Sequence, residues 1–207
     1  MNMLAKNLFV FAGSIAVGMA FARSTEALTL NNSTGLIDPA QTITFNEIEL
    51  PNNTSVIDQY SSLGVEFSPN LVFETSSSPS PNITANQLKN FPPVTNPFSI
   101  HFTDKVSSAA FAFAPPPSTS TFTALLDGSV VESFSSPTHP FNSNNFFGFT
   151  DIVFDEIRID IGEPVNSMRL DNIQFTVAST PEPSSILGLL VAGSIVTGTA
   201  LKKKRST

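Results

Sequence analysis

Apolar and polar residues alternate with a period of two along most of the middle of the chain. This alternation is typical of strands that bury one face and expose the other. An Asp127-Gly128 pair follows one run and precedes Val130 and Val131, which predicts a hairpin turn at that point. The alternating runs are residues 42–46, 64–68, 98–103, 111–113, 122–126, 157–161 and 173–177.

Turn-rich stretches separate these runs, and no convincing helical period of 3.6 occurs outside the two ends of the chain. The turn-rich stretches are residues 51–54, 76–82, 115–117 and 135–145. Several short strands with polar loops predict an all-β domain, an antiparallel β-sandwich of jelly-roll type, over residues 28–178. The loops 76–82 and 135–145 are long enough to be mobile or to form a binding rim.

The N-terminus has the three parts of a secretory signal. Lys6 lies in a short positive region, residues 8–22 are apolar, and small residues end two cleavage patterns at Ala22 and Ala27. We predict a signal peptide over residues 1–27 with cleavage after Ala27, and cleavage after Ala22 is the second choice. A retained signal anchor is the alternative, although the apolar run is shorter than the about 20 residues that a membrane span needs.

The C-terminus, residues 179–207, combines a proline-rich motif, an apolar helix and a basic end. Pro181, Glu182 and Pro183 come first, residues 184–201 follow as the predicted transmembrane helix, and the last segment is residues 202–207. Two prolines disfavour helix and predict an extended, peptidase-accessible segment just outside the bilayer. Cations after an apolar helix favour the cytoplasmic side, which would leave the central domain outside. The basic cluster consists of Lys202, Lys203, Lys204 and Arg205.

This order of elements resembles the PEP-CTERM sorting tail of exported bacterial proteins. The resemblance implies that a membrane-embedded exosortase recognises the tail and cleaves near Pro181-Glu182-Pro183, after signal peptidase has removed the N-terminal signal. It also implies a membrane-anchored precursor and a mature form at the cell surface or in the extracellular matrix. An ordinary single-span anchor with a chance pair of prolines is the alternative.

The central domain carries a second resemblance, to lectin-like and carbohydrate-binding jelly rolls. Its opening segments, residues 43–47 and 60–67, are similar to the first strands of many secreted bacterial sandwich domains. Its closing segments, residues 154–159 and 170–175, are similar to the last strands of lectin-like jelly rolls. The resemblance implies the sandwich fold, and a shared fold does not by itself imply a shared function.

Composition excludes several classes of function. The chain has no cysteine, which excludes disulfides, thiolate metal sites and thiol nucleophiles. Residues 28–180 contain four basic and fifteen acidic residues, a net charge of −11, which disfavours binding to nucleic acid or anionic lipid. The nineteen phenylalanines, beside one tyrosine and no tryptophan, are interpreted as core residues and not as a sugar-stacking platform.

Few residues qualify as site candidates, and no catalytic motif is present. Glu47, Asp155 and Asp171 are the candidates for a structural calcium site, with a solvated acidic surface as the alternative. His101 is expected to point away from the apolar face of its strand, and His139 lies in a loop, so neither is assigned to a metal. Tyr60 is interpreted as a packing residue.

The sequence therefore predicts an exported, non-enzymatic surface or matrix protein without a required cofactor. Its domain would bind glycan, such as extracellular polysaccharide, or envelope partners. Two alternatives are kept: a secreted jelly-roll glycoside hydrolase or lyase, for which two facing carboxylates would be needed, and a purely structural envelope protein.

Overall fold

Alternation of apolar and polar side chains produces strands in most of the expected places. A computed structural model describes residues 28–68, 71–90, 96–162 and 168–179 of the chain. These residues form eleven strands and one turn of 3-10 helix, η1 (Ser61–Leu63). The strands are β1 (Leu28–Asn32), β2 (Gln41–Ile43), β3 (Val65–Phe67), β4 (Leu71–Thr75), β5 (Asn86–Asn90), β6 (Phe98–Ala114), β7 (Ser118–Leu126), β8 (Ser129–Thr138), β9 (Phe146–Thr150), β10 (Phe154–Asp160) and β11 (Arg169–Val177).

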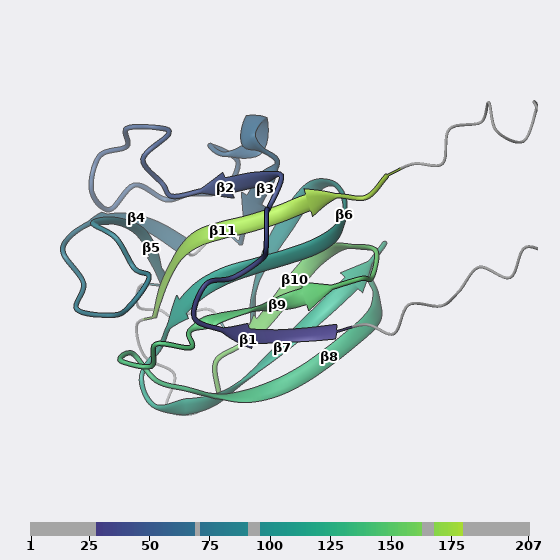
Figure 1. The fold of residues 1–207 in the computed structure, drawn as a ribbon. Coiled ribbons are helices and arrows are strands. Elements are labelled where there is room, and N and C mark those ends of the chain that lie inside the picture. Colours follow the sequence, from purple (N-terminus) through teal and green to yellow (C-terminus); the bar gives the residue numbers. More distant parts are fainter. Residues whose placement is uncertain (1–27, 69–70, 91–95, 163–167, 180–207) are drawn as a thin grey trace, which may run out of the picture.

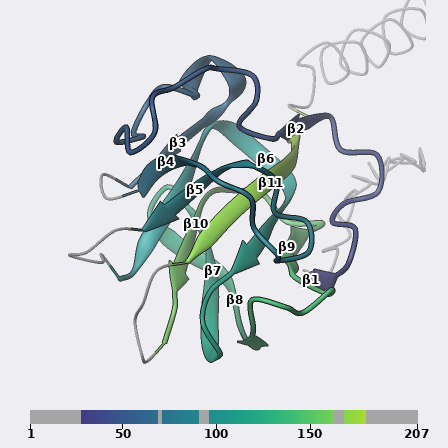
Figure 2. The same ribbon diagram turned by 90° about the vertical axis from the view of Figure 1, so that its left-hand side faces the viewer.

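All strand pairs are antiparallel, and the main path of hydrogen-bonded neighbours is β4-β5-β11-β6-β10-β7-β8. Four further pairs lie off this path: β1 with β9, β9 with β6, β2 with β11, and β3 with β6. Figures 1 and 2 show the strands from two sides, with β11 and β6 next to each other. The all-β, antiparallel prediction is therefore confirmed.

Strand β6 is long enough to belong to both layers of the sandwich. Its first part pairs with β3 and β10, and its second part pairs with β11 and β9. The register between β10 and β6 shifts, because Phe154 lies opposite Val106 whereas Glu156 lies opposite His101. A bulge of this kind bends a strand and lets it turn from one layer into the next.

Phenylalanine side chains fill the space between the layers. Phe122 on β7 and Phe147 on β9 are stacked, with ring centroids 4.7 Å apart, although β7 and β9 are not hydrogen-bonded neighbours. Phe102 on β6 packs against Phe175 on β11 at 5.4 Å. The interpretation of the phenylalanines as core residues is thus confirmed for the described ones, except that Phe134 is only partly buried against the core and Phe141 is 63% exposed.

The alanines of β6 form a second, smaller core on the outer side of their layer. Ala110, Ala112 and Ala114 are buried there together with Ile83 and Phe146. Because alanine side chains are small, the loops that carry Leu36 and Ile83 can approach the sheet closely. This packing holds the long loops of the domain against β6.

Two sequence-based expectations need correction. The segment 135–145 was predicted to be turn-rich throughout, but β8 continues to Thr138. Side-chain hydroxyls of β8 form hydrogen bonds with hydroxyls of β7, Ser135 with Thr121 at 2.8 Å and Ser133 with Thr123 at 3.0 Å. These hydrogen bonds stabilise a strand where the composition predicts a loop. Phe45 was predicted to extend its strand, but β2 ends at Ile43 and Phe45 has a positive φ of 59°.

Candidate functional site

The sorting tail predicted from the sequence lies outside the described residues. This applies to Pro181, Glu182 and Pro183 as well as to the predicted transmembrane helix and the basic cluster. In the described part of the chain, no helix has the length and apolar character to cross a membrane. The last described segment is β11, which ends at Val177, and the backbone N–H of Ala178 donates to the carbonyl oxygen of Lys105 at 2.8 Å.

Asp171 is a fully buried carboxylate on β11, at a position where the pairing with β6 shifts in register. Its Oδ2 accepts hydrogen bonds from the backbone N–H and the hydroxyl of Thr84, at 2.6 and 2.7 Å. Its Oδ1 accepts from the backbone N–H of Asn172, which has a positive φ of 48°. The carboxylate therefore fixes the loop before β5 to the bulge of β11.

Burial raises the pKa of Asp171 to about 6, because the charged form loses its water. The hydrogen bonds from Thr84 and Asn172 act in the opposite direction, and the negative charge of Glu47 adds to the increase. Glu47 itself is exposed and accepts hydrogen bonds from the N–H and hydroxyl of Thr44, at 2.8 and 2.9 Å. Glu47 and Asp171 are thus close enough to interact electrostatically.

Asp155, the third calcium candidate, lies elsewhere. Its two carboxylate oxygens accept from the backbone N–H of Asp127, at 3.2 and 3.0 Å, next to the β7–β8 turn. Among the described residues, no group of three His, Asp or Glu side chains could hold a metal ion. The three calcium candidates do not form one cluster, because Glu47 accepts hydrogen bonds from Thr44, Asp171 from Thr84 and Asp155 from the hairpin turn at Asp127.

Tyr60 packs in the core as expected. Its ring meets Phe45 at 5.1 Å and Phe67 at 6.3 Å in edge-to-face contacts. The side chain is fully buried, and its hydroxyl has no hydrogen-bond partner among the described residues. Burial, together with the charge of Glu47, raises the pKa of Tyr60 to about 12.

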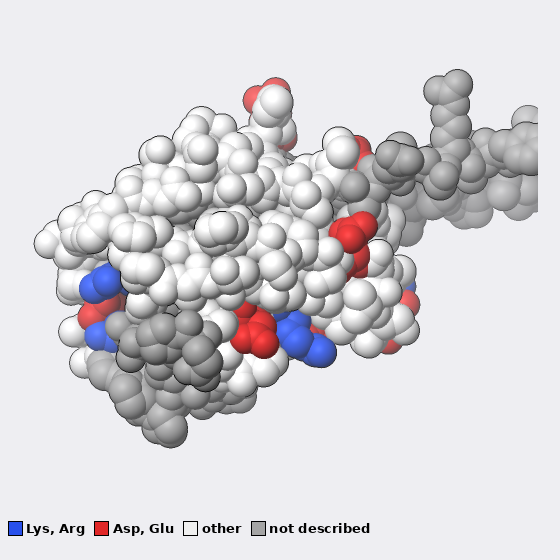
Figure 3. All heavy atoms as spheres, turned by 90° about the horizontal axis from the view of Figure 1, so that it is seen from below, with Lys and Arg blue, Asp and Glu red and all other residues white. Residues whose placement is uncertain are grey.

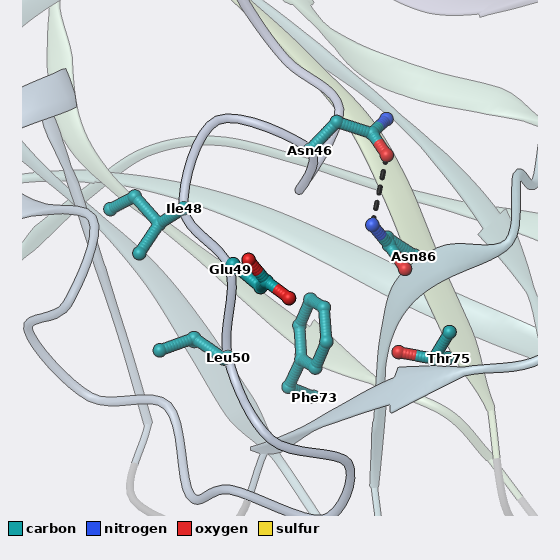
Figure 4. Close-up of a pocket in the computed structure, with 7 residues that line it drawn as sticks. All are labelled: Asn46, Ile48, Glu49, Leu50, Phe73, Thr75 and Asn86. Carbon is teal, nitrogen blue, oxygen red and sulfur yellow. Dashed lines mark hydrogen bonds between the residues drawn. The ribbon is translucent and has the colours of Figure 1, made fainter.

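A pocket of about 380 Å³ opens between the loop after β2 and the hairpin of β4 and β5 (Figure 4). The Asn86 amide donates to Asn46 Oδ1 at 2.9 Å, and Asn46 in turn donates to the Thr44 carbonyl at 3.1 Å. Glu49 is the one carboxylate among the lining residues, so the pocket lacks the carboxylate pair that glycoside hydrolysis needs. The lining residues are Asn46, Ile48, Glu49, Leu50, Phe73, Thr75 and Asn86.

The lining of the pocket exposes more polar than apolar surface. Glu49 and Thr75 are exposed, whereas Phe73 is almost completely buried beneath them. Such a lining fits an uncharged polar ligand, since the nearby carboxylates disfavour an anion.

His101 points to the outer face of its layer, as predicted, and contributes to a charge cluster there. Glu156 accepts from the Ser99 hydroxyl at 2.6 Å and from Arg158 at 3.2 Å, and His101 Nδ1 lies 3.9 Å from its other oxygen. These residues come from β6 and β10, which are neighbours in the sheet but far apart in sequence. Sequence reasoning missed the cluster, although the alternation already placed Ser99 with His101, and Glu156 with Arg158.

Comparisons with known proteins identify no family for this chain. No family model matches it, and no curated protein matches it. Among solved structures, CsCBM6-3 from Clostridium stercorarium in complex with cellobiose aligns with a TM-score of 0.33 and 12% identity, over 67% of this chain and 94% of that one. The Agl-KA catalytic domain aligns with a TM-score of 0.35 and 11% identity, over 72% of this chain and 31% of that one. At these TM-scores, neither likeness bears on function.

Proposed function

We propose that this chain is an exported, non-enzymatic protein of the cell surface or extracellular matrix, whose jelly-roll-type sandwich binds glycan. In this proposal signal peptidase removes residues 1–27, and exosortase processes the PEP-CTERM tail at the extended motif Pro181-Glu182-Pro183. The observation that carries the proposal is the order of the sequence elements: a signal, an acidic domain, the proline motif, an apolar run and a basic end.

The strand boundaries are compatible with both cleavage events. Leu28, the residue that cleavage after Ala27 would make the new N-terminus, belongs to β1 and is the first described residue of the chain. β11 ends at Val177, before the proline motif. Processing at both predicted sites would therefore leave the described strands and their hydrogen bonds intact.

Surface chemistry favours a neutral glycan over an anionic polymer. Figure 3 shows a face on which most side chains are uncharged and the charged ones form small groups. The net charge of −11 over residues 28–180 repels anionic polysaccharides and nucleic acid. Exposed hydroxyls and amides, such as Thr75 and Asn46 at the pocket, provide both donors and acceptors for sugar hydroxyls.

Mass spectrometry of the termini tests the export and sorting part of the proposal. The protein from the envelope and from the culture medium should begin at Leu28 and end near Pro181, with residues 184–207 missing. Replacing Pro181 and Pro183 with alanine should leave the tail attached, whereas the same change at Pro116 and Pro117, in the β6–β7 connection, should not. An intact chain recovered from the cytosol with both ends present would contradict the proposal.

Affinity electrophoresis in gels that contain neutral polysaccharides tests the glycan part. The full chain should be kept in a polyoxyethylene detergent, which carries no sugar that could compete. Retardation by at least one polysaccharide is expected. If the chain migrates unretarded in all gels, the glycan part of the proposal is wrong, and a purely structural role replaces it.

A further inference from the structure

One aromatic side chain departs from the rule that phenylalanine is buried in this domain. Phe141 is 63% exposed, and it is the one aromatic among the large exposed apolar residues of the described segments. It lies in the connection between β8 and β9, beside His139 and Pro140. A phenylalanine ring that stays in water lacks the about 1.5–3 kcal/mol that its burial would contribute to stability. Core packing therefore does not explain the exposed position of Phe141.

The segment that carries Phe141 is a tight turn with internal hydrogen bonds. The backbone N–H of Asn142 donates to the carbonyl oxygen of His139 at 3.2 Å, and the N–H of Phe141 donates to Nδ1 of His139 at 3.1 Å. The two rings lie 5.6 Å apart at an angle of 55°. The turn therefore presents two aromatic rings together in a defined geometry.

Strands β1 and β6 and the loop that carries Asn82 hold the base of this turn in place. Asn31 donates to the Asn144 carbonyl at 2.8 Å, and the Phe113 N–H donates to the Asn145 carbonyl at 2.9 Å. Asn145 is buried, and its Oδ1 accepts from Asn82 at 2.7 Å. Because the base is fixed from three directions, a ligand that binds the turn has little loop entropy to remove.

The polar groups of the turn define the chemistry of the ligand. Since Nδ1 of His139 accepts a hydrogen bond, the neutral imidazole carries its proton on Nε2, which becomes a donor. Asn142 Oδ1 accepts from the Asn144 N–H at 3.0 Å, so the Asn142 amide group offers donors as well. Residues 140–145 include no charged side chain. An aromatic face flanked by neutral donors fits an uncharged ligand that has an apolar face and acceptor hydroxyls.

We propose that this turn binds a neutral polysaccharide by stacking a pyranose ring on Phe141, with His139 and Asn142 donating hydrogen bonds to its hydroxyls. The proposal rests on the glycan-binding function proposed above and assigns that function to a site.

Affinity electrophoresis of the full chain in the sugar-free detergent, with a series of concentrations of each neutral polysaccharide, tests the assignment. Phe141→Ala should weaken binding about tenfold, as a loss of about 1.4 kcal/mol. Phe141→Leu keeps apolar bulk without an aromatic face and should lose nearly as much, whereas Phe141→Tyr should bind within about twofold of the wild type. Val130→Ala is the matched control, because Val130 on β8 is also 63% exposed.

The outcomes separate the site from the function. If the chain binds a polysaccharide and Phe141→Ala binds it equally well, the assignment to this turn is wrong and the proposed function stands. If no polysaccharide retards the chain, both are wrong. If Phe141→Leu retains full binding, the contact with the polysaccharide requires apolar bulk and not an aromatic face, and the assignment of ring stacking is overturned.

Discussion

The rings of Phe122 and Phe147 lie nearly parallel, inclined by 13°, with centroids 4.7 Å apart. Phe122 belongs to β7 in one layer and Phe147 to β9 in the other, and both are buried. Since no hydrogen bond joins these two strands, the contact between the layers at this point depends on side-chain packing. The pair therefore reports directly on how firmly the two layers are held together.

Phe147→Ala should lower the free energy of unfolding by about 3–5 kcal/mol, because it leaves a cavity between the layers. The double variant with Phe122→Ala should lose about 0.5–1.5 kcal/mol less than the sum of the two single losses. Denaturant unfolding followed by far-ultraviolet circular dichroism measures both quantities. Phe141→Ala is the matched control, since the same change at an exposed position should cost less than about 0.5 kcal/mol. Strictly additive losses would show that the two rings do not stabilise each other.

Several of the strands that the sequence predicted, such as β10, have one buried and one solvent-facing side. The alternation of Ile157 and Ile159 with Arg158 correctly predicted β10, and the Asp127-Gly128 pair correctly predicted the β7–β8 turn. Both turn residues have positive φ, 49° and 78°, as a two-residue hairpin turn requires. Local rules suffice in these cases because the residues that set the structure are neighbours in sequence.

Strand β9 escaped prediction for a physical reason. Its three phenylalanines divide between two cores, with Phe147 and Phe149 in the main core and Phe146 against the alanines of β6. A strand that is buried on both faces carries apolar residues on both, so its sequence shows no alternation. The loops that cover its second face come from other parts of the chain, so the residues of the strand do not predict them. The hydrogen bonds of Asp171 could not be predicted for a similar reason. Asp171 and its partner Thr84 are 87 residues apart, and no local pattern links them.

Asp171 should make the stability of the domain depend on pH. Its pKa in the folded state is about 6, above the ordinary value of 3.8, so the folded state favours the protonated form. The resulting stabilisation of the folded state is fully present below about pH 4 and is lost as the pH rises through 6. The free energy of unfolding should therefore fall by about 3 kcal/mol from this group between pH 4 and pH 7.

Urea unfolding of the wild type and of Asp171→Asn across pH 4 to 7 tests this expectation. The variant cannot ionise, so the difference in stability between pH 4 and pH 7 should shrink by about 3 kcal/mol relative to the wild type. Asp38→Asn changes the same group at an exposed loop position and should leave the contribution of Asp171 in place. Parallel pH profiles for the wild type and Asp171→Asn would rule out this role of the buried carboxylate.

Tyr60 offers a substitution that should stabilise the domain. Its hydroxyl is buried without a hydrogen-bond partner among the described residues, and such a group costs about 1–3 kcal/mol of desolvation. Tyr60→Phe removes the hydroxyl and keeps the ring contacts with Phe45 and Phe67, so the free energy of unfolding should rise by about 1 kcal/mol. Thermal unfolding of both proteins measures the change. A clear loss of stability in Tyr60→Phe would mean that the hydroxyl has a partner in the folded protein.

Gly148 on β9 is required by the close approach of β6. A Cβ atom at this position would lie 2.0 Å from the Ala109 carbonyl oxygen and 2.7 Å from the Cα of Ala110, both of which are backbone atoms. Gly148→Ala should therefore force β9 away from β6 and lower the free energy of unfolding by about 3 kcal/mol, the upper end of overpacking costs. The effect should appear as faster hydrogen exchange in β9 and in its neighbour β1, because β1 pairs with β9.

Gly128→Ala separates this steric effect from the backbone preference of glycine. Gly128 has a positive φ of 78°, but nothing lies within 4 Å of the position that a Cβ would take. Its replacement should cost only about 1–2 kcal/mol, the energy of holding an L-residue in a left-handed conformation. If the two variants lose the same stability and the exchange of β9 is unchanged, the close packing of β9 on β6 is not what requires glycine at position 148.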